Sequence, residues 1–113
     1  DPEYAYRQAR QLLEDHPEIT SVYTVPDSAA SVSRAIQDTG RVGKIVHIGF
    51  GMTDATRPYI LDGSLSAIIG HRAEQQGYLP FSILLDPFSG GLVPETRRIL
   101  MLNDIFIKQN SVF

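Results

Sequence analysis

The fold of this chain is decided by residues 44–77, which read KIVHIGFGMTDATRPYILDGSLSAIIGHRAEQQG. Two short apolar runs in this stretch, residues 44–48 and 66–69, are each followed by a glycine and then by a polar segment that can begin a helix. This arrangement is typical of parallel strands joined by helical crossovers. Ligands of such sheets bind beyond the carboxyl ends of the strands. We therefore look for function in residues 49–54 and 70–72.

The segment before this stretch predicts a helix, a strand and a second helix. The first helix begins at Pro2 and ends before Pro17, because proline suits a first helical turn and disfavours helical geometry in the residue before it. Residues 20–25 are rich in β-branched and aromatic side chains and predict a strand. The second helix ends at Gly40. The first helix is expected to bury one stripe of residues, Ala5, Ala9, Leu12 and Leu13.

The remaining segments continue the alternation. A helix is predicted to begin near Thr56, which places Pro58 in its first turn, and to end by Gly63. A fourth helix follows, which Pro80 should kink or delay. A last strand, interrupted at residues 103–104, is predicted from the alternating residues Ile99, Met101, Ile105 and Ile107. Four helices alternating with four strands predict a layered α/β domain.

Composition narrows the functional classes. The 113 residues are 42% hydrophobic and 20% charged, as in a soluble globular protein, and suit one domain. The net charge is −3 and the ten basic residues are scattered, which argues against binding to a nucleic-acid backbone by this chain. There is no cysteine for a disulfide or thiolate metal site, and no apolar run approaches a membrane span of about 18 residues.

Three side chains at or near strand ends carry possible chemistry, each with a simpler alternative, and a histidine within a strand is considered beside them. Asp27 can accept hydrogen bonds from a ligand hydroxyl or cap a helix. His71 can donate to a ligand or act as a base, or be an ordinary polar loop residue. Arg72 can pair with an anionic ligand or form a surface salt bridge. His47 lies within a strand and is expected to be buried and hydrogen-bonded.

Motifs of known catalytic sites are missing or incomplete. The segment Gly49-Phe50-Gly51 is half of a dinucleotide fingerprint, whose third glycine would fall at Asp54. The chain has no phosphate-binding G-x-x-x-x-G-K loop, no G-x-S-x-G nucleophile elbow and no H-E-x-x-H metal motif. We therefore expect no catalytic residues, no cofactor and no metal site.

Seven segments, taken in their order, carry a family resemblance: residues 16–19, 25–30, 35–40, 45–53, 60–69, 71–78 and 105–111. They resemble the C-terminal part of the effector-sensing domain of LacI/GalR-type transcriptional regulators, whose fold is shared with periplasmic sugar-binding proteins of type I. The resemblance implies a three-layer α/β lobe with a mainly parallel sheet flanked by helices. It also implies that residues 1–113 are a single partial domain, without the DNA-binding helix-turn-helix and most of the first lobe.

The resemblance also implies a ligand site at three strand ends. In the family an aspartate, a second aspartate and a glutamine from these places contact a sugar or similar effector. Asp27 matches the first. Gly51, followed by Met52, stands where the second aspartate is expected. His71 replaces the glutamine and Arg72 the aspartate after it, so the residues expected to bind the ligand are Asp27, Gly51, Met52, His71 and Arg72.

The resemblance therefore predicts the effector-sensing part of a bacterial transcriptional regulator, and not an enzyme. A small molecule, a sugar or a sugar-like compound, would bind in the cleft between two lobes, and DNA would be bound only by the absent N-terminal domain. We expect a cytoplasmic homodimer, joined through the free edge of residues 20–25, with no membrane partner. The last segment, residues 105–111, favours a regulator. The alternatives are the solute-binding component of a sugar transporter and a small α/β enzyme using His71 and Asp27.

Overall fold

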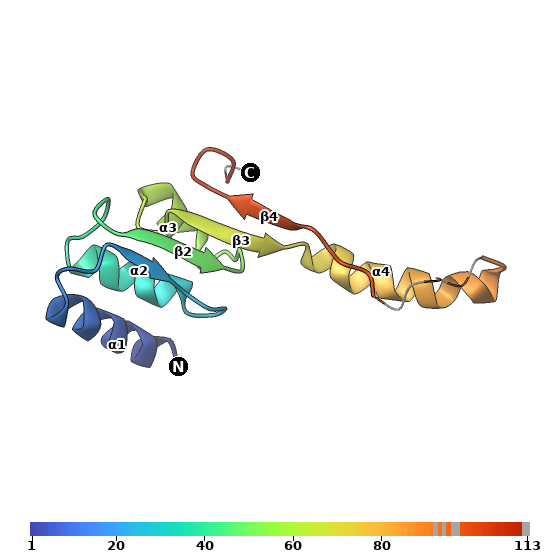
Figure 1. Cartoon of the computed structure of the whole chain (residues 1–113), viewed down its shortest axis with the longest axis horizontal. Coiled ribbons are helices and arrows are strands. Elements are labelled where there is room, and N and C mark those ends of the chain that lie inside the picture. The colour runs from blue at the N-terminus through green and yellow to red at the C-terminus, as the bar shows by residue number, and fades with distance from the viewer. Residues whose placement is uncertain (92, 94, 96–97, 112–113) are drawn as a thin grey trace. The chain divides into compact units, whose positions relative to one another are not determined.

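The computed structural model describes residues 1–91, 93, 95 and 98–111 (Figure 1). Over these residues α-helices and strands alternate along the chain, as the sequence predicts. The elements are α1 (Pro2–Asp15), β1 (Ser21–Tyr23), α2 (Ala29–Asp38), β2 (Val46–Phe50), α3 (Arg57–Asp62), β3 (Ala67–His71), α4 (Ala73–Leu85), the 3-10 helix η1 (Asp86–Ser89) and β4 (Asn103–Phe106).

The chain divides into two compact units. Unit 1 comprises Asp1–Gly70 and Ile105–Phe113, and unit 2 comprises His71–Asp104. Unit 1 holds the first three helices and nearly all of the sheet, whereas unit 2 holds α4 and η1. The expectation that residues 1–113 form a single partial domain stays a prediction.

The four strands form one sheet in the order β1-β2-β3-β4. Strand β2 is parallel to both β1 and β3, with Val22 opposite His47 and Gly49 opposite Ile68. Strand β4 runs in the opposite direction, as its arrow shows (Figure 1). The mainly parallel sheet flanked by helices is therefore confirmed.

The helices of unit 1 cover one face of this sheet. Residues opposite each other in parallel strands point to the same face. Gly49 shows which face is covered, because a Cβ atom built on it would lie 2.9 Å from the Ala29 Cβ of α2 and 3.3 Å from Leu65 after α3. The other face leaves Tyr23 62% and Val46 55% exposed. Within unit 1 the sheet and its helices thus form two layers, and the three-layer arrangement implied by the resemblance stays a prediction.

Two apolar clusters stabilise unit 1. The first joins α1 to α2 and contains Tyr6, Leu13, Ala35, Ile36 and Ile45. The second lies between α3 and β3 and contains Ile60, Leu65 and Ile68. The stripe predicted for α1 is wrong at Leu12, which is 52% exposed, because α1 turns Tyr6 and Leu13 toward α2 instead.

Proline and glycine set several element boundaries as predicted. Helix α3 begins after Thr56 with Pro58 in its first turn, and Gly63 ends it in the left-handed conformation at φ 90°. Of the two effects expected of Pro80, the delay is wrong, since α4 begins at Ala73 and continues through this proline, and the kink stays a prediction. The predicted interruption at residues 103–104 is also wrong, because both belong to β4.

Candidate functional site

The candidate site begins at the carboxyl edge of the sheet, where parallel strands end together. Asp27 follows β1, and Gly51 and Met52 follow β2. Because β1 and β2 are parallel neighbours, these three residues lie at the same edge of unit 1. The structure groups these three of the five residues that the sequence predicts for the site.

Asp27 is held in a turn that presents its carboxylate to solvent. Its φ is 71°, a left-handed conformation that aspartate tolerates better than most residues. The following Ser28 begins α2 and donates its hydroxyl to the Val25 carbonyl oxygen at 2.9 Å, which closes the turn. Asp27 also lines a hollow of about 280 Å³ beside the start of α1. The Asp27 carboxylate is thus exposed on a constrained loop and does not cap α2.

The loop after β2 places the backbone of Gly51 and the side chain of Met52 where the family that the sequence resembles has an aspartate. The Gly51 amide donates to the Ile69 carbonyl oxygen at 2.8 Å, and Gly51 has a φ of 90° with open space around its Cα. Met52 is half-buried and packs against the cluster of α3 and β3. The nearby Asp54 carboxylate lies 3.7 Å from the Arg57 guanidinium and is fully exposed to solvent, so it does not take the place of the missing carboxylate.

The other two predicted residues, His71 and Arg72, belong to unit 2. His71 is the exposed last residue of β3. Arg72 makes a two-point ion pair with Asp104, Nε to Oδ2 at 3.1 Å and Nη2 to Oδ1 at 3.0 Å. The hydrogen bond and the negative charge of Asp104 raise the pKa of Arg72 above its usual value. The structure therefore supports the simpler of the two roles considered for Arg72, an ion pair within the protein.

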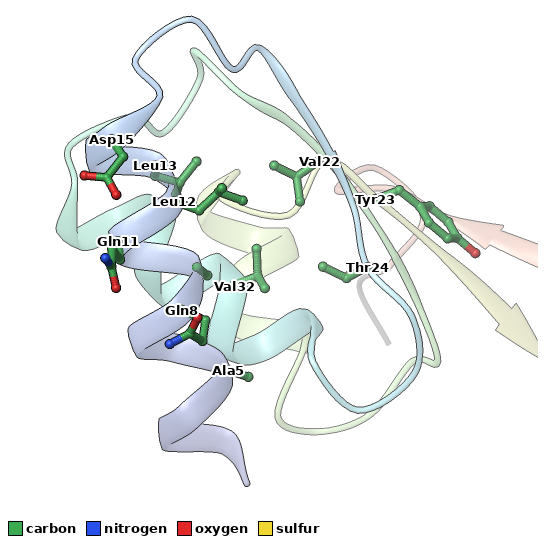
Figure 2. Close-up of a pocket in the computed structure, with 11 residues that line it drawn as sticks. Ala5, Gln8, Gln11, Leu12, Leu13, Asp15, Val22, Tyr23, Thr24 and Val32 are labelled. Carbon is green, nitrogen blue, oxygen red and sulfur yellow. The ribbon is translucent and has the colours of Figure 1, made fainter.

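A hollow that the sequence analysis missed lies between α1 and β1 (Figure 2). Its volume is about 520 Å³, and Leu12, Val22 and Val32 line it together with polar residues of α1. It lies beside the outer edge of β1, the first strand in the sheet order. Helical periodicity alone could not reveal it, because the hollow depends on which face α1 turns toward α2.

The described residues offer neither a metal site nor a helix that could span a membrane. Among residues 1–91, 93, 95 and 98–111, no group of three histidine, cysteine, aspartate or glutamate side chains could hold a metal ion. No helix in the described part of the chain is long and apolar enough to cross a membrane. The exposed Asp27 carboxylate gives the carboxyl edge of the sheet a hydrogen-bond acceptor. The backbone at Gly51 has open space beside it, where a ligand could approach.

Comparison with known structures identifies the architecture. A glucose-galactose binding protein from Geobacillus stearothermophilus matches at 21% identity with a TM-score of 0.83, over 97% of this chain and 39% of that protein. A sugar-binding protein of a Bacillus halodurans sugar ABC transporter matches at 22% identity with a TM-score of 0.87, over 98% and 41%. An ABC transporter solute binding protein from Agrobacterium vitis with bound D-fucose matches at 25% identity with a TM-score of 0.83, over 97% and 38%.

These likenesses define the α/β fold, and the chain spans about two fifths of the length of these three proteins. The sequence model of the periplasmic binding protein domain family matches residues 1–91. The chain therefore belongs to the periplasmic binding protein domain family. Comparison with curated protein sequences gives no match.

The family confirms the periplasmic-binding-protein-like part of the sequence prediction. The more specific prediction, a LacI/GalR-type regulator, finds no support in these three structures, which are all described as sugar-binding or solute-binding proteins. None of these three is described as an enzyme, which agrees with the expectation of a binding function. The five predicted ligand-binding residues stay a prediction.

Proposed function

We propose that this chain is part of a sugar-binding protein that serves a transporter, and that the carboxyl edge of its sheet contacts the sugar. The sequence analysis gives the solute-binding component of a sugar transporter as an alternative to the transcriptional regulator, and the neighbouring structures favour that alternative. The observation that supports it is the match to sugar-binding proteins over 97–98% of the chain with TM-scores of 0.83–0.87.

The chemistry of the edge suits a neutral polyhydroxylated ligand. A carboxylate accepts hydrogen bonds from two neighbouring hydroxyls at once, and bonds to a charged acceptor are stronger than those to a neutral one. Asp27 supplies this acceptor on a loop held by the Ser28–Val25 hydrogen bond. We assign Gly51 and Met52 the role of a backbone and apolar wall, whereas the roles of His71 and Arg72 in ligand binding stay predictions.

Replacement of Asp27 by asparagine should weaken sugar binding about ten-fold, because the amide loses the charge that strengthens each hydrogen bond. Isothermal titration against D-glucose, D-galactose and D-fucose measures this change. Asp54→Asn is the matched control, since Asp54 is an exposed aspartate paired with Arg57 after the next strand. Equal affinities of wild type and Asp27→Asn for a sugar that binds would contradict the assignment of Asp27.

The transcriptional regulator remains a second candidate on one observation, the likeness of residues 105–111 to the last segment of LacI/GalR-type proteins. The two candidates differ in place and partner. The regulator would act in the cytoplasm with DNA, whereas the transporter component would act outside the cytoplasmic membrane. Cell fractionation with an antibody against the chain separates them, and recovery in the cytoplasm would contradict the transporter proposal.

We also propose that the chain forms a homodimer through the edge of β1. The Thr24 amide donates to Ile48 at 2.9 Å and the Val46 amide donates to Thr20 at 2.9 Å, so alternate residues of this strand face β2. The backbone groups of Ser21 and Tyr23 therefore turn toward the open edge, which can pair with a second strand. We expect sedimentation velocity to show a dimer that dissociates on dilution.

Substitution of Tyr23 by proline should give a monomer at every concentration, since proline removes the amide that the partner strand needs. Tyr4→Ala is the control, because Tyr4 is a similarly exposed tyrosine on α1 rather than on the strand. A wild-type chain that sediments as a monomer at every concentration would contradict the dimer.

A further inference from the structure

His47 lies at the centre of a buried polar cluster that the proposed sugar site does not use. Its side chain is fully buried, at 0% exposure, in the middle strand of the parallel part of the sheet. Its Nε2 atom lies 3.0 Å from the Thr24 hydroxyl of the segment after β1, and its Nδ1 atom lies 3.1 Å from the Ser33 hydroxyl of α2. One imidazole ring thus connects three successive elements of unit 1.

The two hydroxyls satisfy both ring nitrogens of a neutral histidine. A neutral imidazole has one donor and one acceptor, and a hydroxyl can serve either, so the three side chains can complete their bonds without a charge. Thr24 is 5% exposed and Ser33 is 0% exposed. A hydroxyl beside an imidazole can act as a nucleophile in other proteins, but burial keeps this pair away from any substrate.

The cluster includes the residue that begins the loop presenting Asp27. Thr24 is three residues before Asp27, and its amide donates to the Ile48 carbonyl oxygen at 2.9 Å. Its side chain is the one that bonds to His47. Both the backbone and the side chain of Thr24 therefore hold the start of this loop against β2.

We propose that Thr24, Ser33 and His47 form a polar lock that holds the Asp27 loop against the sheet, and that protonation of His47 in acid releases it. His47 is thus a positioning residue, which acts on Asp27 through Thr24. The use of the loop for sugar binding rests on the proposed function, whereas the lock can be tested without a ligand.

Among the residues that the structure describes, no carboxylate forms an ion pair with His47. Residues 20–25, which include β1, carry no charged side chain. On the other side of β2, the Ser66 hydroxyl accepts a hydrogen bond from the His47 amide at 3.1 Å. Three charged residues of the surrounding helices have other partners: Arg34 pairs with Glu3, Asp38 accepts from the Tyr6 hydroxyl, and Asp62 accepts from the Ser64 amide. A second ring proton would therefore leave a buried positive charge without a paired carboxylate, which is costly.

Burial lowers the pKa of His47 from its usual 6.5 to about 4, and a hydrogen bond with the backbone of Ser64 acts in the opposite direction. Between these two values the opened form binds a proton that the closed form does not. Acid therefore favours opening as the pH falls from 6.5 toward 4, and below 4 both forms are protonated and the effect stops growing. Above 6.5 the lock has its full strength.

Hydrogen exchange at the Thr24 amide of the full chain tests the lock. After correction for intrinsic exchange, the protection factor of this amide should fall about 30-fold between about pH 7.5 and about pH 5, as a proton binds the open form. The Thr39 amide, bonded to Ala35 at 3.0 Å in α2, is the internal reference and should change less. A parallel NMR titration should place the midpoint of the His47 ring near pH 4.

His47→Gln separates titration from packing. Glutamine keeps a donor and an acceptor but cannot titrate, so Thr24 protection should no longer fall over this pH range. His16→Gln is the matched control, since His16 is exposed beside Glu18 at 2.9 Å and should leave the fall unchanged. Thr24 protection that is independent of pH in the wild type, or a His47 ring that titrates near 6.5, would overturn the proposal. The ring titration needs no variant, so it decides even where His47→Gln fails to fold.

Discussion

Replacement of Gly49 by valine should destabilise the chain by about 3 kcal/mol or more. The first added atom already meets three neighbours, with the Ala29 Cβ at 2.9 Å, the Leu65 Cδ1 at 3.3 Å and the Thr24 Oγ1 at 3.4 Å. The Ala29 Cβ cannot swing away, because it is fixed to the backbone of α2. Relief therefore requires α2 to move off the sheet, which would also disturb the apolar cluster and the His47 lock.

Urea unfolding followed by circular dichroism measures this effect. Ile48→Val is the matched control, because Ile48 is the next residue back in β2 and its side chain lies 36% exposed on the uncovered face. Its cost should stay below about 1 kcal/mol. A Gly49→Val chain with an unchanged urea midpoint would show that α2 does not pack against this face as described.

Arg41→Ala should cost about 2–4 kcal/mol, the second large effect. The Arg41 guanidinium donates to the carbonyl oxygens of Leu13 at 3.0 Å and Pro17 at 3.0 Å, and it also donates to that of Ile19. These oxygens span the end of α1 and the segment that enters β1. Alanine removes the donors and leaves carbonyl groups of this segment without their charged partner.

The same urea experiment measures Arg41→Ala, with two comparisons. Arg41→Lys should recover only part of the loss, because an ammonium group lacks the planar fork that spans several carbonyls. Arg10→Ala should change little, since Arg10 forms an exposed pair with Glu14 at 2.8 Å. Equal stability of the Arg41→Ala and Arg10→Ala chains would contradict the role given to Arg41.

The elements that the sequence predicts well are those with local signals. Thr56, Pro58 and Gly63 bracket α3, because proline and glycine restrict the backbone wherever they occur. The burial of His47 was also predictable, since it stands within an apolar strand. The class of the fold follows from the alternation of such elements, and the structure confirms it.

Features that depend on contacts between distant segments could not be predicted. Helical spacing marks a stripe on α1 but does not say that Tyr6 is buried and Leu12 exposed, because that depends on the position of α2. The hydroxyl partners of His47 come from two other elements. Arg41 binds backbone carbonyls, whose positions leave no trace in the side-chain pattern. The ligand residues were inferred by resemblance, and only the three at the edge of unit 1 are grouped by the structure.

The central claim is that a sugar contacts the carboxyl edge of β1 and β2. Titration of the nitrogen-15-labelled chain with D-fucose, followed by two-dimensional NMR, tests it most directly. We predict that the amide signals of Asp27, Ser28, Gly51 and Met52 shift together with one binding curve, while that of Thr39 at the far end of α2 stays in place. Shifts confined to residues away from this edge, or no shift at a saturating sugar concentration, would contradict the claim.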